Sequence, residues 1–151
     1  MYGCTFIGHK NCSEEIKTLL VTTIKRLIEE KTVTTFYVGT EGNFDKYVYT
    51  VLCQIAKEYD IKIIVVLAYL KPKAEWVYYD QEKTIFPDEL TKTPIKFAIK
   101  RRNSYMIDKA EYLVTYLNTS TSNTYTNVEE AIKKKKKIIN LGHYNIFGIE
   151  L

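Results

Sequence analysis

Short apolar runs alternate with helical periodicity along the whole chain. The runs typical of strands are residues 4–8, 33–38, 61–70, 111–117 and 137–141. The segments with apolar side chains at helical spacing are residues 13–30, 44–59, 93–108 and 127–136. Strands joined by helical crossovers form parallel sheets that helices cover on both faces. We therefore predict an α/β fold, a Rossmann-like three-layer sandwich with a mainly parallel sheet of about five strands.

Length and composition indicate one globular domain. The chain has 151 residues, of which 46% are hydrophobic and 26% charged, so it is long enough to bury a core. We find no internal repeat, linker or second domain, and predict a single domain over residues 1–151. The last ten residues, GHYNIFGIEL, are expected to dock on this domain or on a partner.

Export and membrane insertion are not expected. The N-terminal MYGCTFIGHK lacks a charged segment followed by a long apolar one. The longest apolar run, Ile63 to Leu70, is too short to span a bilayer. The three cysteines form no CxxC pair, which suits a reducing compartment. We expect a soluble, cytoplasmic protein.

The net charge of +4 depends on one run of lysines, Lys133–Lys137. At the end of a helix these lysines would oppose the negative end of the helix dipole. The same run is also compatible with a patch that contacts nucleic acid. Because no aromatic residues interleave with it and no nucleic-acid motif accompanies it, we favour the helix-end interpretation and do not expect nucleic acid as a partner.

Glycines, hydroxyls and amides follow the predicted strands. Parallel sheets bind ligands beyond the carboxyl ends of their strands, near the point where the strand order reverses. The segments at those ends are residues 8–12, 39–45, 69–71 and 118–124. We therefore expect a ligand site along this edge of the sheet.

Gly8 and Gly39 each end a strand and precede a helix. Such a glycine lets the backbone approach a phosphate at the helix N-terminus, or it only makes a tight turn. His9 and Lys10 could pair with that phosphate, or lie on an exposed loop. No metal site is expected, because His143 is the only other histidine and no Cys/His spacing supports one.

Charged residues near these loops have two interpretations each. Asp45 could accept hydrogen bonds from ribose hydroxyls, or act as a first-turn acid that favours the helix dipole. Glu41 and Asp45 could also serve as catalytic carboxylates. One of Arg101 and Arg102 is expected to reach the pocket, with the other exposed to solvent.

Five stretches in this order resemble the SLOG superfamily, the Rossmann-like group of DprA-like and LOG-like proteins: CTFIGHK, FYVGTEGNFD, VVLAYL, FPDELTKTP and IKRRNSYMI. The resemblance is strongest to a small stand-alone SLOG family. It implies a Rossmann-like fold that binds nucleotides or nucleotide-derived signals, without a cofactor. With the strand-end loops it gives the candidate ligand-binding residues Gly8, His9, Lys10, Gly39, Thr40, Glu41, Gly42, Asn43, Asp45, Tyr69, Arg102, Asn103, Ser122, Asn123 and Thr124.

Two departures from the family pattern bear on catalysis. Lys10 stands where an arginine is usual, and Ser122-Asn123-Thr124 stands where a glycine pair is usual. LOG-type phosphoribohydrolases, which are similar, carry a glycine-rich stretch with a catalytic glutamate, whereas TSNTYTNVEE keeps Glu129 without the glycines.

The function that the resemblance implies is therefore binding of an ADP-ribose-like or cyclic nucleotide signal, and a phage could use such binding to sequester the signal. The alternative is a nucleoside-monophosphate N-glycosidase that uses Glu41, Asp45 or Glu129.

A cluster of large apolar side chains lies in an irregular segment: Trp76, Tyr78, Tyr79, Ile85 and Phe86. Aromatic residues with one polar end are enriched at interfaces. We predict a homo-oligomer, a dimer or a tetramer, with this segment or an adjoining helix at the contact. The alternative is that these rings cap the sheet edge of a monomer.

Overall fold

The structure is a computed structural model that describes residues 2–70 and 80–146. The strands are β1 (Tyr2–Gly8), β2 (Val33–Val38), β3 (Lys62–Val66), β4 (Thr84–Ile85), β5 (Tyr112–Tyr116) and β6 (Lys137–Asn140). The α-helices are α1 (Ile16–Lys31), α2 (Gly42–Ile55), α3 (Ile95–Lys109) and α4 (Asn123–Lys133). Short 3-10 turns at Gln81–Lys83 and Asp88–Leu90 lie between β3 and α3.

All strands pair in parallel in one six-stranded sheet with the order β4-β3-β2-β1-β5-β6. The chain adds strands outward from β1 to β4 and then returns to the other side of β1 to form β5. The strand order therefore reverses between β1 and β5. This arrangement confirms the predicted α/β, Rossmann-like fold and places its switch point at the carboxyl end of β1.

The sheet has one strand more than the sequence predicts. Thr84 and Ile85 pair with Val65 and Val66 of β3 and form the edge strand β4. Two residues are too few to show strand periodicity. Strand β4 was therefore not visible in the sequence.

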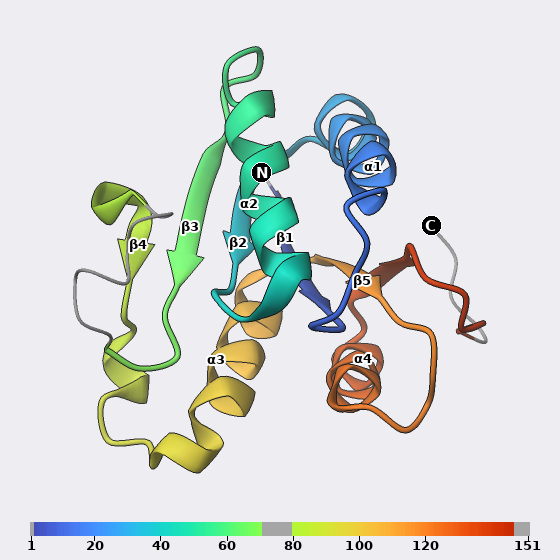
Figure 1. The fold of residues 1–151 in the computed structure, drawn as a ribbon. Coiled ribbons are helices and arrows are strands. Elements are labelled where there is room, and N and C mark those ends of the chain that lie inside the picture. Colours follow the sequence, from blue (N-terminus) through green and yellow to red (C-terminus); the bar gives the residue numbers. More distant parts are fainter. Residues whose placement is uncertain (1, 71–79, 147–151) are drawn as a thin grey trace.

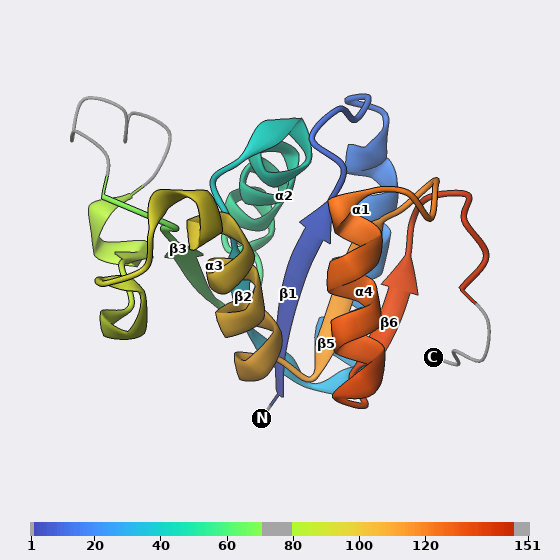
Figure 2. The same cartoon turned by 90° about the horizontal axis from the view of Figure 1, so that it is seen from below.

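Helices cover both faces of the sheet, α1 and α2 on one and α3 and α4 on the other (Figures 1 and 2). The first layer buries the apolar sides of α1 and α2 against β1 and β2, with Leu20, Val48 and Phe36 fully buried. The second packs Met106 of α3 and Val128 of α4 against β5. The central strands are apolar on both faces because neither face is exposed to water.

Helix α4 begins earlier than predicted. Helical spacing predicts a helix from residue 127, but the polar residues 123–126 already form the first turn of α4. Ser122 is the N-cap, and its Oγ accepts a hydrogen bond of 3.2 Å from the Tyr125 N–H. A serine in this position satisfies a backbone donor at the helix start. The cap brings Asn123 and Thr124 to the carboxyl edge of the sheet.

Parts of three expectations lie outside the described residues. Trp76, Tyr78 and Tyr79 of the predicted contact segment do so, as do Lys71 and the last residues of the C-terminal tail. The first half of the tail docks on the domain, where the Tyr144 N–H donates to the Leu117 carbonyl at 2.9 Å. A homo-oligomer remains a prediction. No α-helix in the described part of the chain is long and apolar enough to cross a membrane.

Candidate functional site

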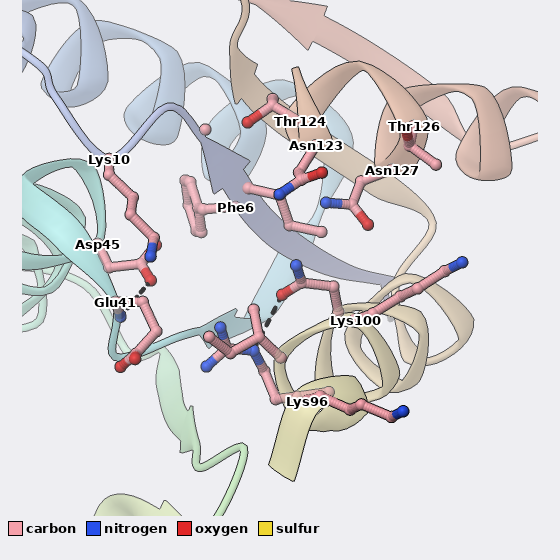
Figure 3. Close-up of a pocket in the computed structure, with 15 residues that line it drawn as sticks. Phe6, Lys10, Glu41, Asp45, Lys96, Lys100, Asn123, Thr124, Thr126 and Asn127 are labelled. Atoms are coloured by element: carbon pink, nitrogen blue, oxygen red, sulfur yellow. Dashed lines mark hydrogen bonds between the residues drawn. The ribbon is translucent and has the colours of Figure 1, made fainter. Parts of the chain in front are cut away.

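A cavity of about 480 Å³ opens at the carboxyl end of β1, where the strand order reverses. It lies between the first turns of α2 and α4 and one side of α3 (Figure 3). Its lining is Phe6, Ile7, Gly8, Lys10, Glu41, Asp45, Lys96, Ile99, Lys100, Arg102, Asn103, Asn123, Thr124, Thr126 and Asn127. A volume of this size is ordinary for a site that encloses a small organic ligand.

Arg102 joins the two helical layers at this edge. Its side chain is 2% exposed although it carries a full charge. Its Nε donates to Asn103 Oδ1 at 2.9 Å, and its Nη1 donates to the Val66 carbonyl at the end of β3 at 3.2 Å. The Arg102 side chain therefore extends from α3, which covers one face of the sheet, to the carboxyl edge of the sheet. Arg101, its neighbour, is exposed, so only one of the two arginines lines the cavity.

Gly39 makes room for Arg102 beside Asp45 of α2. A Cβ at position 39 would lie 2.8 Å from Asp45 Oδ2 and 2.9 Å from Arg102 Cζ and Nη1. These distances are too short for a side chain to fit without moving a charged group. The glycine therefore allows a buried cation and a buried carboxylate to meet against the backbone that follows β2.

Asp45 is 7% exposed, and its Oδ2 accepts a hydrogen bond of 2.8 Å from the Glu41 N–H. Burial raises the pKa of Asp45 from 3.8 to about 6, while the charge of Arg102 and this hydrogen bond act in the opposite direction. A carboxyl group with a raised pKa inside a cavity is a common feature of functional sites.

The raised pKa makes stability depend on pH. The folded protein binds the Asp45 proton more tightly than the unfolded chain, so this group favours folding below about pH 4 and loses that effect as pH rises through about 6. The unfolding free energy of the wild type, minus that of Asp45→Asn, should rise by about 2–3 kcal/mol between pH 7 and pH 4. Urea unfolding of both proteins at the two pH values measures this difference in unfolding free energy. A difference that is flat, or falls as the pH is lowered, would show that Asp45 is not held in a desolvated position.

The loop after β1 is locked to the start of α2. Gly42 has a φ of +84°, and a Cβ there would lie 2.7 Å from Lys10 Cα. The Asn43 N–H donates to the Lys10 carbonyl at 2.8 Å. Glycine is therefore required at position 42 both by the left-handed backbone conformation and by the close approach to Lys10. The contact fixes the backbone of Lys10 at the rim of the cavity.

Gly8 is also a packing position. A Cβ there would lie 2.7 Å from the Phe44 ring. The glycines of the loops that follow β1 and β2, Gly8, Gly39 and Gly42, are thus each explained by a close contact within the protein. Gly8 also lines the cavity, so its closeness to a bound anion remains a prediction.

His9 connects the loops that follow β1 and β5. Its Nε2 accepts a hydrogen bond of 2.9 Å from the Asn118 N–H, and its ring meets the Tyr116 ring edge-on at 5.9 Å. Partial burial lowers the pKa of His9. Because Nε2 acts as an acceptor, the imidazole is neutral in this arrangement. His9 holds the two loops together and does not line the cavity.

The structure brings together about half of the predicted ligand-binding residues. Those that line the cavity are Gly8, Lys10, Glu41, Asp45, Arg102, Asn103, Asn123 and Thr124. Those that lie outside its lining are His9, Gly39, Thr40, Gly42, Asn43, Tyr69 and Ser122. Two of these hold Glu41: Thr40 Oγ1 donates to its carboxylate at 3.1 Å, and the Tyr69 hydroxyl at 3.4 Å. Glu129, the third candidate catalytic acid, is exposed on α4 and is not part of the lining.

Sequence reasoning found Arg102 and Asn103 of α3 but missed the other residues that this helix contributes to the lining. Lys96, Ile99, Lys100 and Asn103 line the cavity at positions i, i+3, i+4 and i+7, which form one face of the helix. Thr126 and Asn127 of α4 were also missed. The spacing on α3 was the available signal, but a polar helix face is usually solvated rather than part of a site.

The cavity carries more positive than negative charge. Lys10, Lys96 and Lys100 are exposed at its rim and Arg102 is buried, whereas the acids of the lining are Glu41 and Asp45. Figure 3 shows Lys10, Glu41 and Asp45 on one side, Asn123, Thr124 and Asn127 on the opposite side, and the two α3 lysines below. Among the described residues, no group of His, Cys, Asp and Glu is arranged to hold a metal ion. This composition suits an anionic ligand that also carries hydroxyl or amide groups.

Solved structures of DNA processing protein A share this fold. DNA processing protein A (DprA) from Streptococcus pneumoniae superposes with a TM-score of 0.71 at 16% identity, over 98% of this chain and 53% of that one. DNA processing protein A from Helicobacter pylori gives a TM-score of 0.67, also at 16% identity, over 98% of this chain and 67% of that one. The chain thus spans about half the length of the first protein. At this identity the likeness shows the fold.

The expectation about nucleic acid is wrong. The Helicobacter pylori structure is described as showing a unique single-stranded DNA binding mode, so this fold is compatible with a nucleic-acid ligand. The expectation failed because it relied on known nucleic-acid motifs and on residues interleaved along the sequence. A folded surface can gather lysines and aromatic rings from distant segments.

A family model that matches nearly the whole length of the sequence shows the family of this chain. No curated protein matches the chain significantly. The model of the YspA SLOG family matches residues 4–150, which include all the strands and helices described above except the first two residues of β1. The resemblance to SLOG proteins seen in the strand-end motifs is therefore confirmed, and the chain belongs to the YspA SLOG family.

Proposed function

We propose that the cavity binds a nucleotide-derived small molecule and holds it without catalysing a reaction. The observation that carries the proposal is the gathering of Lys10, Lys96 and Lys100 around the buried Arg102 at the switch point of the sheet. Open α/β sheets bind their ligands at this point. Membership of an SLOG family supports a nucleotide-related function.

The two sides of the cavity suit different parts of such a ligand. Asn123 and Thr124 lie in the first turn of α4, where backbone N–H groups and the helix dipole favour phosphate. Lysines at the rim add charge without fixing one geometry, which suits a phosphate or pyrophosphate. Glu41 lies across the cavity and can accept hydrogen bonds from ribose hydroxyls. An ADP-ribose-like molecule and a cyclic nucleotide both combine these groups.

Retention of the ligand would make the protein a sequestering agent. The resemblance to LOG-type hydrolases implies a catalytic glutamate in the pocket. The candidate for that residue, Glu129, lies on the exposed side of α4 and does not line the cavity. A protein that binds a signal without consuming it lowers the free concentration of that signal. Capture of a bacterial defence signal by a phage protein is one biological setting for such a binder.

Hydrolysis of an N-glycosidic bond is a second candidate function, and Asp45 is the observation that favours it. A buried carboxyl with a pKa raised to about 6 can donate or accept a proton near neutral pH. Glu41 would then stabilise the positive charge that develops on the sugar. Chromatography of the ligand after incubation separates the two functions, since a binder returns the intact nucleotide and a hydrolase releases the free base.

Single-stranded nucleic acid is a second candidate ligand. The Helicobacter pylori protein of the same fold is described as binding single-stranded DNA. Its phosphates would need a surface that carries lysines. The described residues offer such surfaces at the rim of the cavity and at the lysine run that ends α4. Binding by either surface should weaken steeply with salt.

Removing the α3 lysines tests the small-molecule proposal. Lys96→Gln and Lys100→Gln should each weaken binding of AMP or ADP-ribose about tenfold, because each removes a charge-assisted contact to phosphate. Lys92→Gln is the matched control, since Lys92 is exposed just before α3 and does not line the cavity. Calorimetric titration measures the affinities. Equal affinity in all three variants would place the ligand elsewhere.

A further inference from the structure

A second group of lysines lies at the opposite edge of the sheet, where its strands begin. A hollow of about 430 Å³ there is lined by Tyr2, Glu30, Lys31, Thr32, Glu111, Tyr112, Lys134, Lys135, Lys136 and Lys137. It forms where α1 and α4 end and where β1, β5 and β6 begin. We call Tyr2, Lys31, Lys135, Lys136 and Lys137 the lysine edge. It brings together residues that are more than a hundred positions apart in the sequence.

The acidic residues of the hollow are already engaged. Glu30 pairs with Arg26 at 2.8 Å, and Glu111 accepts a hydrogen bond of 2.7 Å from the Gly3 N–H. Lys134 is different from its neighbours, because it bridges Asp108 of α3 and Glu130 of α4. Within the described residues, the four lysines of the lysine edge form no ion pair. Glu111 keeps its negative charge, because its hydrogen-bond donor is a neutral backbone N–H, so it offsets part of the charge of these lysines and leaves a local excess of positive charge.

The dipoles of the two helices do not account for this charge. Helices α1 and α4 both end here, and each C-terminus carries roughly half a negative charge. Together they offset about one of the four lysines. Lys135 also has a φ of +60°, a left-handed conformation in which glycine is usual at a helix end. The left-handed conformation favours glycine at position 135, but the residue is lysine and adds a positive charge.

An exposed aromatic ring stands beside these amines. Tyr2 is 48% exposed and meets the Tyr112 ring edge-on at 6.4 Å. The Lys137 ammonium lies over the Tyr112 ring, 5.6 Å from its centre. The exposed Tyr2 ring and the lysines line the same hollow, and proteins that bind single strands combine these groups, since bases stack on a ring and phosphates meet the lysines. None of the described residues that line the hollow has an aliphatic side chain, which argues against insertion into a lipid surface.

We propose that the lysine edge binds the phosphate backbone of single-stranded nucleic acid, with one base stacked on Tyr2. This surface is separate from the cavity, which opens at the other ends of the same strands. Binding at one edge leaves the other accessible. The proposal therefore does not depend on the identity of the ligand in the cavity.

The test is fluorescence anisotropy with a labelled oligothymidylate. The variant Lys31→Gln/Lys135→Gln/Lys136→Gln should lose at least tenfold in affinity at low salt. The slope of log affinity against log salt should become shallower by about 2, as expected for three lost phosphate contacts on a single strand. The control Lys57→Gln/Lys83→Gln/Lys92→Gln has the same net charge, and its affinity should stay within about twofold of the wild type, since none of its positions lines either surface.

Tyr2 tests the stacking contact separately. Tyr2→Ala should weaken oligonucleotide binding about fivefold or more, while Tyr2→Phe keeps the ring and the affinity. Thermal unfolding checks that each variant is folded. The proposal is overturned if Lys96→Gln/Lys100→Gln weakens oligonucleotide binding more than the lysine-edge variant does, because the strand would then lie at the cavity. It is also overturned if duplex or anionic vesicles bind better than the single strand, or if the wild type binds no oligonucleotide.

Discussion

Replacing Arg102 with methionine is expected to lower the free energy of unfolding at pH 7 by about 3–5 kcal/mol and to abolish nucleotide binding. The guanidinium is buried and bonded to Asn103 and to the Val66 carbonyl, and its charge lowers the pKa of the buried Asp45. Methionine would fill much of the volume but leave that carboxylate without its cation. The loss of stability should come from the buried charge of Asp45, which Arg102 no longer compensates, and not from a cavity in the core.

Arg101→Met is the matched control, since Arg101 is the adjacent residue of α3 and is exposed. Its effect on stability should stay within about 0.5 kcal/mol. Urea unfolding at two pH values gives a further check, because protonation of Asp45 below about pH 6 removes the charge that Arg102 compensates. The destabilisation by Arg102→Met should therefore be smaller at pH 5 than at pH 7. Equal stability of the two variants would contradict the role given to Arg102.

Gly39→Val is expected to be the second most damaging change. Its Cβ would lie within 3 Å of both Asp45 and Arg102, so the side chains of this charged pair must move. Overpacking of this kind typically destabilises a protein by about 1–3 kcal/mol. Displacement of Arg102 would also remove it from the cavity lining. We therefore expect loss of binding together with loss of stability.

A double-mutant cycle identifies the contact responsible. If Gly39→Val acts by displacing Arg102, its cost in stability should be clearly smaller in the Arg102→Met background than in the wild type. Methionine is flexible and uncharged, so it can yield to the added side chain. Additive costs would instead indicate that valine disturbs the backbone turn after β2, with no particular dependence on Arg102.

The strands of this fold were predictable where their ends are marked. The β-branched and aromatic run VTTFYV ends at Gly39, and β2 is found at Val33–Val38 as predicted. The first turn of α4 was hidden because its polar residues are typical of loops, and only the Ser122 cap reveals it. Strand β4 could not be seen, since its pairing with β3 depends on tertiary structure and not on local pattern.

The site was predictable in part for a topological reason. Loops that follow parallel strands must meet at one edge, which is why Gly8, Lys10, Glu41 and Asp45 were placed together. The lysines of α3 were not, because a strand-end rule does not include the side of a helix. The resemblance to SLOG proteins, and not periodicity, singled out Arg102 and Asn103. The burial of Arg102 between Gly39 and the end of β3 depends on tertiary structure, so it could not be predicted from the sequence.

The account depends most on the claim that the cavity holds a nucleotide-derived anion. Native mass spectrometry of the purified protein, mixed with AMP, ADP, a cyclic nucleotide and ADP-ribose, tests it most directly. We predict one bound molecule per chain on the wild type, recovered intact on denaturation, and its loss from the Lys96→Gln/Lys100→Gln variant. A wild type with no nucleotide adduct, or a variant that retains it fully, would contradict the claim.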